Sequence, residues 1–282
     1  MKSSGLEEHE LVLRPYFSDG AAGRVFCVFV GPPPGAPRRG GVLFVPPFAE
    51  EMNKTRRQVM LQARALAAAG FGVLLMDLLG TGDSSGEFAD GRLPIWREDL
   101  LGGVRSLERE GFAPAAVWGL RWGALLATDV ARIIGVTRLV LWQPAVDGRQ
   151  YMDQFIRLRT AATMLRGTAR ETVQDLRKLL AAGQALEVAG YELHPEVVAA
   201  IDGQSLSALR PPPACTVDWV ETVRDADTGV SVGSQRIIDG WRQTGVEVRS
   251  AAVVGQQFWA TVEITVAPAL IEHTTQSLSG RA

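Results

Sequence analysis

The sequence predicts a doubly wound α/β fold built on a mostly parallel sheet of eight strands. Short runs rich in Val, Leu and Ile alternate with helical segments from residue 41 onward, which is typical of parallel sheets covered on both faces. Before this alternation, two apolar or alternating runs at 11–16 and 24–30 flank a turn at 18–20. They predict an opening antiparallel hairpin.

The next elements follow in a regular order. Strands and helices are expected in turn at residues 41–45, 54–69, 72–76, 95–110, 115–118, 122–134 and 138–142. Each strand is short and apolar, and each helical segment is long enough to connect two parallel strands.

An insertion interrupts this order after the sixth strand. Amphipathic segments at 151–165 and 168–182 lead into residues 185–193 and a short helix after Pro195. We expect residues 148–209 to form a helical lid over the carboxyl edge of the sheet, above a core made of residues 1–147 and 210–282. In that core the sheet resumes with a strand at 215–220, a helix at 234–244 and a strand at 246–254, and 258–270 leads to a polar tail.

Composition limits the classes of function. The 282 residues include 29 basic and 31 acidic side chains, so no net charge attracts nucleic acid. No run of eighteen apolar residues occurs, and residues 1–10 are polar and acidic, so we expect a cytoplasmic protein without a membrane span. Cys27 and Cys215 lie far apart without histidines at metal spacing, which favours buried thiols over a disulfide or zinc site. We expect no metal and no cofactor.

The most informative motif is residues 116–123, which read Ala-Val-Trp-Gly-Leu-Arg-Trp-Gly. Gly119 and Gly123 flank Arg121 between a predicted strand and a predicted helix, as the glycines of G-x-S-x-G flank a nucleophilic serine. The motif therefore resembles the nucleophile elbow of an α/β-hydrolase, in which the glycines let strand and helix approach closely. Arg121 stays protonated and offers no lone pair, so it cannot attack a carbonyl as Ser or Cys does.

Arg121 admits two interpretations. The elbow's helix N-terminus and the guanidinium both suit a carboxylate or phosphate, which predicts an anion pocket with Trp122 beside it. Alternatively, Arg121 only fills the vacated site and is neutralised by Glu50, Glu51 or Asp225, because a buried unpaired arginine is strongly destabilising.

The loop after the third strand occupies the place from which an α/β-hydrolase supplies an oxyanion-hole N–H. Its prolines lack that hydrogen, whereas Phe48 and Ala49 have it. Glu50 and Glu51 begin the next helix, where the dipole favours carboxylates, and they could instead pair with Arg121 across the site. The predicted ligand-binding residues are Phe48, Ala49, Glu50, Glu51, Arg121 and Trp122.

No complete acid–base pair accompanies the elbow. Asp225 and Asp227 follow the seventh sheet strand, where an acid is expected, although aspartates also favour plain turns. Gln256 and Gln257 occupy the expected place of the base and cannot transfer a proton.

The histidines are His9, His194 and His273. We expect all three at the surface, with His194 on the lid as the one that could reach the pocket. With the nucleophile and the base both replaced, nearly all covalent catalysis is lost.

A glycine-rich loop at 76–86 follows a predicted strand but lacks the spacing of either nucleotide-binding loop. We expect a tight turn in which Asp77 and Asp83 accept hydrogen bonds from nearby N–H groups.

Four segments carry a resemblance to a known family: residues 46–57 (PPFAEEMNKTRR), 77–86 (DLLGTGDSSG), 119–123 (GLRWG) and 190–193 (GYEL). Together they resemble the exosortase A system-associated hydrolase 2 family, over about residues 43–259. The resemblance implies an α/β-hydrolase fold and association with bacterial exopolysaccharide and protein-sorting gene clusters. Matching to the superfamily puts the nucleophile's place on Arg121, an oxyanion donor on Phe48 or Ala49, the acid on Asp225 or Asp227, and the base on Gln256 or Gln257.

Three hypotheses follow. The first is a hydrolase-fold protein without serine-hydrolase chemistry that binds a small anionic or acyl-bearing ligand, or a partner, beneath its lid. The second is an ester or thioester hydrolase with a non-standard nucleophile or an activated water, using Glu51, Asp225 or His194 as base. The third is a structural scaffold, which predicts a filled cleft and an exposed apolar patch for a protein partner or a second copy of the chain.

Overall fold

The computed structural model describes residues 10–165 and 171–280 of the chain. Its main sheet contains β1 (Val12–Asp19), β2 (Arg24–Gly31), β3 (Gly40–Val45), β4 (Phe71–Met76), β5 (Pro114–Leu120), β6 (Arg138–Trp142), β9 (Thr216–Val223) and β10 (Glu247–Val254). The strands lie in the order β1-β2-β4-β3-β5-β6-β9-β10. β1 pairs antiparallel with β2 and β2 antiparallel with β4, and all the other neighbours are parallel. The predicted doubly wound sheet with its opening hairpin is confirmed.

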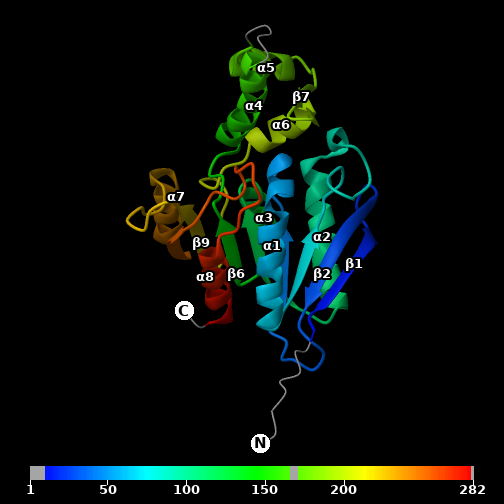
Figure 1. Ribbon diagram of the computed structural model, residues 1–282, viewed down its shortest axis with the longest axis vertical. Helices are drawn as coiled ribbons and strands as arrows, with labels where there is room; N and C mark the ends of the chain where they lie inside the picture. The colour runs from blue at the N-terminus through cyan, green and yellow to red at the C-terminus, as the bar shows by residue number, and fades with distance from the viewer. Residues whose placement is uncertain (1–9, 166–170, 281–282) are drawn as a thin grey trace, which may run out of the picture.

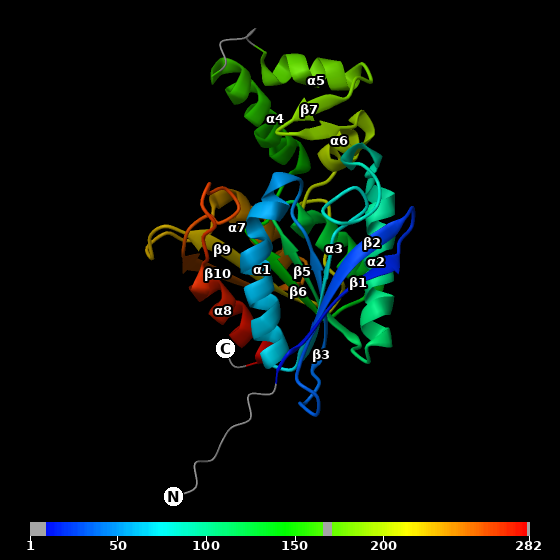
Figure 2. The ribbon, with the colours of Figure 1, turned by 45° about the vertical axis from the view of Figure 1, so that its right-hand side comes forward.

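Helices cover both faces of the sheet (Figures 1 and 2). One face carries α1 (Glu50–Ala68) and α8 (Pro268–Ser279), and the other carries α2 (Leu93–Arg109), α3 (Gly123–Ile134) and α7 (Val232–Gln243). Successive strand residues point to opposite faces, so Phe44 belongs to the core under α1 while Leu43 belongs to the core under α2 and α3.

The N-terminus of α1 differs from the prediction. The sequence predicts a helix from residue 54, whereas α1 begins at Glu50. Ala49 has a φ of 53°, which turns the chain sharply out of the loop after β3. Glu50 and Glu51 then occupy the first helical turn, where the dipole stabilises carboxylates.

The cap segment, residues 148–209, connects β6 to β9, and its described residues, 148–165 and 171–209, lie over the carboxyl ends of the parallel strands (Figure 1). They form α4 (Gly148–Leu165), α5 (Val173–Ala181), the short hairpin β7 (Leu186–Val188) and β8 (Tyr191–Leu193), and α6 (Pro195–Asp202). Residues 168–170, predicted as the start of the second amphipathic segment, lie outside the described residues. α5 begins after Thr172, whose side chain caps it.

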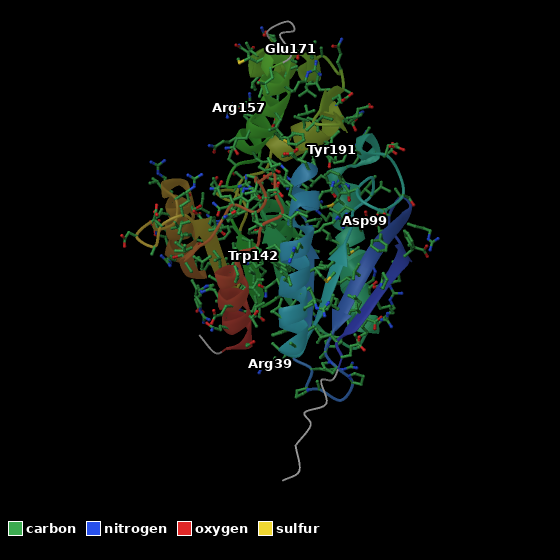
Figure 3. The ribbon with its side chains drawn as sticks, in the orientation of Figure 1. Arg39, Asp99, Trp142, Arg157, Glu171 and Tyr191 are labelled. Atoms are coloured by element: carbon green, nitrogen blue, oxygen red, sulfur yellow. The ribbon has the colours of Figure 1, made fainter. Side chains whose placement is uncertain are left out.

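Aromatic and polar contacts hold the cap segment on the core. Tyr191 of β8 lies where the two meet (Figure 3), with its ring 4.8 Å from that of Phe88, and its hydroxyl accepts a hydrogen bond from Asn53 Nδ2 at 3.2 Å. Arg92 pairs with Glu196 at 2.8 Å, and Trp122 Nε1 donates to Gln204 Oε1 at 3.2 Å. The cap segment is therefore closed onto the core.

The structure also bears on the predictions for the two cysteines, the glycine-rich loop and membrane spans. Cys27 and Cys215 are both free and buried, and burial raises the pKa of each thiol to about 12, so both stay protonated. In the loop after β4, Asp77 Oδ2 accepts from Asp83 N at 3.0 Å, which confirms the self-bonded turn and the role of Asp77, whereas Asp83 takes part as a backbone donor and not, as predicted, as an acceptor. None of the helices in the described ranges is long and apolar enough to cross a bilayer.

The junction of β5 and α3 has no room for side chains at its two glycines. A Cβ on Gly119 would lie 2.6 Å from Ala127 Cβ, and one on Gly123 would lie 2.4 Å from the Pro46 carbonyl oxygen. Arg121, between them, has a φ of 57°, a conformation that non-glycine residues seldom adopt. The backbone is thus that of a nucleophile elbow, as the glycine spacing predicts.

We predict that Gly123→Ala lowers the free energy of unfolding by about 2–3 kcal/mol, because the new methyl group meets backbone atoms that cannot move aside. The matched control is Gly102→Ala in α2, where a Cβ would meet only Arg105 Nη2 at 3.6 Å. It should be neutral or stabilise by about 0.5–1 kcal/mol. Urea unfolding of both variants measures the difference, and equal effects would contradict the close approach.

Candidate functional site

Arg121 lies at the carboxyl end of β5 and is paired with an internal acid. Its Nε donates to Glu51 Oε1 at 3.1 Å, and its Nη1 donates to the Gln143 carbonyl oxygen at 3.4 Å. The second oxygen of Glu51 accepts from the Tyr151 hydroxyl at 2.8 Å. The side chains of Arg121 and Glu51 are only 16% and 14% exposed. Of the three acids proposed as partners of Arg121, Glu51 is the one in contact.

Two aromatic rings flank the same guanidinium. Its central carbon lies 5.6 Å from the ring centroid of Tyr151 on α4 and 5.4 Å from that of Trp259, which follows β10. Such cation–π contacts stabilise a partly desolvated guanidinium. Arg121 therefore joins residues from β5, α1, the cap segment and the C-terminal part of the core.

Burial governs the protonation of the groups around Arg121. Burial raises the pKa of Glu51, and the opposing effects of the Arg121 charge and the Tyr151 hydrogen bond reduce the rise without cancelling it. Burial, followed by the nearby Glu51 carboxylate, raises the pKa of Tyr151 well above its ordinary value. The Tyr151 hydroxyl is therefore a hydrogen-bond donor at neutral pH.

A pocket of about 340 Å³ adjoins Arg121 on the side of β6 and β9. Its polar lining residues are Arg121, Gln143, Asp147, Gln150, Tyr151, Gln154, Glu221, Ser231 and Ser234. Gln150 and Gln154 lie one turn apart on α4. Among residues 10–165 and 171–280, Arg121 makes its side-chain hydrogen bonds through Nε and Nη1 and none through Nη2.

The charges of this pocket, here called the elbow pocket, disfavour an anion. Glu51 already neutralises Arg121, and Asp147 and Glu221 add two carboxylates to the lining. Glu221 is only 4% exposed, and its carboxylate accepts from Ser231 N at 2.9 Å and Trp219 Nε1 at 3.1 Å. Among the described residues the lining contains no second basic side chain. The elbow pocket suits an uncharged molecule that both donates and accepts hydrogen bonds.

The structure does not place Phe48 and Trp122 in the elbow pocket. Phe48 is 2% exposed, and its ring packs against those of Trp122 at 5.6 Å and Phe155 at 5.4 Å. These rings fill the space between the elbow and the cap segment. Ala49 lines a different pocket of about 510 Å³, together with Asn53 and Tyr191. Glu50 pairs with Lys54 at 3.2 Å.

The expected acid and base positions also lie elsewhere. Asp225 and Asp227 are exposed on the loop after β9, where the Asp225 carbonyl accepts from Thr228 N. Gln256 and Gln257 are exposed and line a separate pocket of about 640 Å³ with Arg224. Trp259, two residues further along, is the residue of that loop that contacts Arg121.

The histidines do not complete a triad in the described part of the chain. His194 caps α6, where its Nδ1 accepts from Glu196 N at 3.2 Å. His273 lies on α8, and His9 lies outside the described residues. Neither His194 nor His273 lines the elbow pocket.

Comparison with known proteins identifies the fold of the chain. No protein-family model and no curated protein matches the chain. Among solved structures, Est1E from Butyrivibrio proteoclasticus with bound ferulic acid superposes with a TM-score of 0.68 at 14% identity, covering 94% of this chain and 96% of that one. A highly thermostable carboxyl esterase from Bacillus coagulans gives 0.63 at 15% identity, covering 96% and 99%. The chain has the α/β-hydrolase fold.

A third neighbour is an α/β serine hydrolase homologue from Coxiella burnetii, with a TM-score of 0.55 at 14% identity, covering 95% of this chain and 96% of that one. These identities establish the α/β-hydrolase fold and leave the chemistry to the site itself.

Four residues that lie around Arg121 are not predicted from the sequence as site residues: Gln143, Tyr151, Glu221 and Trp259. Glu221 carries a usable signal, because it is one of two acidic residues inside a strand that is buried almost throughout. Tyr151 is the first large apolar residue of an amphipathic helix, which by itself indicates only packing. Nothing in the local sequence distinguishes Trp259 as the residue that contacts the elbow of this α/β-hydrolase fold.

We predict that Arg121→Met destabilises the protein in a pH-dependent manner, by about 3 kcal/mol at neutral pH, because it leaves the buried Glu51 carboxylate without its counter-charge. Loss of the guanidinium raises the folded-state pKa of Glu51 further above its ordinary value of 4.5. A carboxyl group whose pKa is raised by folding contributes to the free energy of unfolding below its unfolded pKa. This contribution is lost as pH rises through its folded pKa.

The deficit of Arg121→Met relative to the wild type should therefore be small near pH 4 and grow as pH rises, as measured by urea unfolding at several pH values. Adding Glu51→Gln should recover most of the loss at neutral pH. A deficit that does not change with pH would contradict the pairing.

Proposed function

We propose that this α/β-hydrolase-fold protein is a non-catalytic binding or accessory protein that takes a small ligand at the elbow pocket. The observation that carries the proposal is the Arg121–Glu51 ion pair at the place of the nucleophile. A guanidinium cannot attack a carbonyl, and its partner carboxylate holds it in place. The open elbow pocket favours a ligand-binding role over a purely structural scaffold.

The lining supports an uncharged acyl-bearing ligand over an anionic one. An ester carbonyl would accept a hydrogen bond from Arg121 Nη2, and the amides of Gln150 and Gln154 would donate to and accept from its polar groups. An anion in the same place would face Asp147 and Glu221 at close range, which is unfavourable in a partly buried site.

The proposal also includes the cellular role, the location and the domain division of the protein. A role beside exosortase and exopolysaccharide systems, and a cytoplasmic location, rest on the resemblance of the sequence motifs and on the composition. The division into a core of residues 1–147 and 210–282 and a lid of residues 148–209 rests on the way the cap segment interrupts the α/β-hydrolase order between β6 and β9.

The competing function is an ester or thioester hydrolase that activates a water molecule. Its best candidate base is Glu51, because burial raises the pKa of this carboxyl and it stands beside the elbow. Both Glu51 oxygens already accept hydrogen bonds, from Arg121 and Tyr151, so a water would have to compete with them. Asp225 is exposed on its loop and His194 caps α6, which argues against either as the base.

We predict that the protein neither reacts with a fluorophosphonate probe nor hydrolyses p-nitrophenyl butyrate above the rate in buffer, because no described residue forms a nucleophile–base pair at the elbow. Gel fluorescence and absorbance at the nitrophenolate band measure the two reactions. Turnover that Arg121→Ala or Glu51→Gln abolishes would instead establish the hydrolase.

We also predict that ethyl butyrate binds at the elbow pocket more tightly than butyrate, as measured by ligand-observed NMR titration. Gln154→Leu should weaken the ester about fivefold, the equivalent of one lost hydrogen bond. The matched control is Gln184→Leu, an exposed glutamine of the cap segment outside the elbow pocket. Tighter binding of butyrate, or equal effects of the two variants, would contradict the proposed ligand.

A further inference from the structure

A second cavity lies between α1 and the strands β2, β3 and β4, and the elbow chemistry does not use it. Its volume is about 340 Å³. The walls are mostly apolar and include Phe26, Val28, Phe44, Met52, Met60 and Leu75. Flexible methionines let such a cavity adapt its shape to an apolar guest.

The cavity, here called the α1 cavity, adjoins an exposed apolar face of the sheet. In the β1–β2 pairing Phe17 stands opposite Phe26 and Leu13 opposite Val30, so each pair points to the same face. Phe17 is 46% exposed and Leu13 is 52% exposed. The Phe17 ring lies 5.4 Å from that of Phe26, which lines the cavity. Beyond α1 this face of β1 and β2 carries no helix (Figure 2).

Charged residues at the α1 cavity have a net positive charge. Arg56, Arg57 and Asp77 line it. Arg56 pairs with Asp77 at 3.0 Å, whereas Arg57 has no ion pair within the described residues. The two arginines and one aspartate leave one positive charge, carried by Arg57, at the edge of an apolar hollow. This is the reverse of the elbow pocket, which is polar and holds excess carboxylate.

We propose that the α1 cavity binds a fatty-acid-like amphiphile, with its alkyl chain among the apolar walls and its carboxylate at Arg57. A cavity of about 150 Å³ accommodates benzene, so the observed volume suits a chain of roughly 10–12 carbons. Chain burial supplies the affinity, because each buried methylene contributes about 0.8 kcal/mol. The guanidinium selects the anionic head group.

Isothermal titration calorimetry of the full chain with decanoate, decanol and acetate tests this assignment. Decanoate should bind with a negative heat-capacity change, decanol about fivefold more weakly, and acetate not measurably. Arg57→Gln should weaken decanoate about fivefold and leave decanol unchanged. The matched control is Arg64→Gln, an exposed arginine two turns along α1 that does not line the cavity and should change neither affinity.

Met60→Trp, which fills the α1 cavity, should abolish decanoate binding, with circular dichroism and an unchanged melting temperature verifying the fold. If this variant fails to fold, Arg57→Gln with its control still decides the matter. The proposal is overturned if decanoate does not bind at millimolar concentration, or if Arg57→Gln and Arg64→Gln act alike. It is also overturned if the protein binds anionic phospholipid vesicles but not free decanoate, since the face is then a membrane-docking surface.

Discussion

A guanidinium that is buried at a sharp backbone turn must be neutralised by the protein, because it cannot release its proton. That requirement organises the region around Arg121. Glu51 supplies the counter-charge from the first turn of α1, where the helix dipole already favours a carboxylate. Tyr151 completes the hydrogen bonding of Glu51, and the rings of Tyr151 and Trp259 flank the cation. Residues that are distant in the sequence are thus fixed relative to one another by one charge.

The same charge links the cap segment to the core. Tyr151 belongs to α4, so opening of the cap segment would break its hydrogen bond to Glu51 and expose the Phe48–Phe155 contact. Aromatic rings occupy much of the space between the elbow and the cap segment. Their packing stabilises the contact of the cap segment with the core at the expense of open space above the elbow.

The succession of strands and helices along the chain and the elbow geometry are largely accessible from the sequence, because both follow from local patterns. The apolar runs specify which segments are strands, and Gly119 and Gly123 specify where strand and helix meet. Local patterns do not specify which of several acids meets Arg121. Glu50 and Glu51 are neighbours in sequence, yet they point about 100° apart on a helix, so a shift of one residue in the helix start exchanges their roles. In the same way, the path of the loop after β10 brings Trp259 to Arg121 and leaves Gln256 and Gln257 in solvent.

The two pockets differ in how well they suit the anionic and the acyl-bearing ligands that the sequence leaves as alternatives. A long acyl chain needs an apolar cavity, and an anion needs excess positive charge. The elbow pocket offers neither, because its walls carry amides, hydroxyls and two carboxylates and its one cation is already paired, so it suits only a short, uncharged acyl group that hydrogen-bonds to these polar walls. The α1 cavity offers both, with apolar walls and an arginine that has no ion pair among the described residues. In this α/β-hydrolase fold, a buried arginine at the elbow does not by itself favour an anion, because the neutralising Glu51 that makes the buried guanidinium tolerable also reduces its attraction for anions.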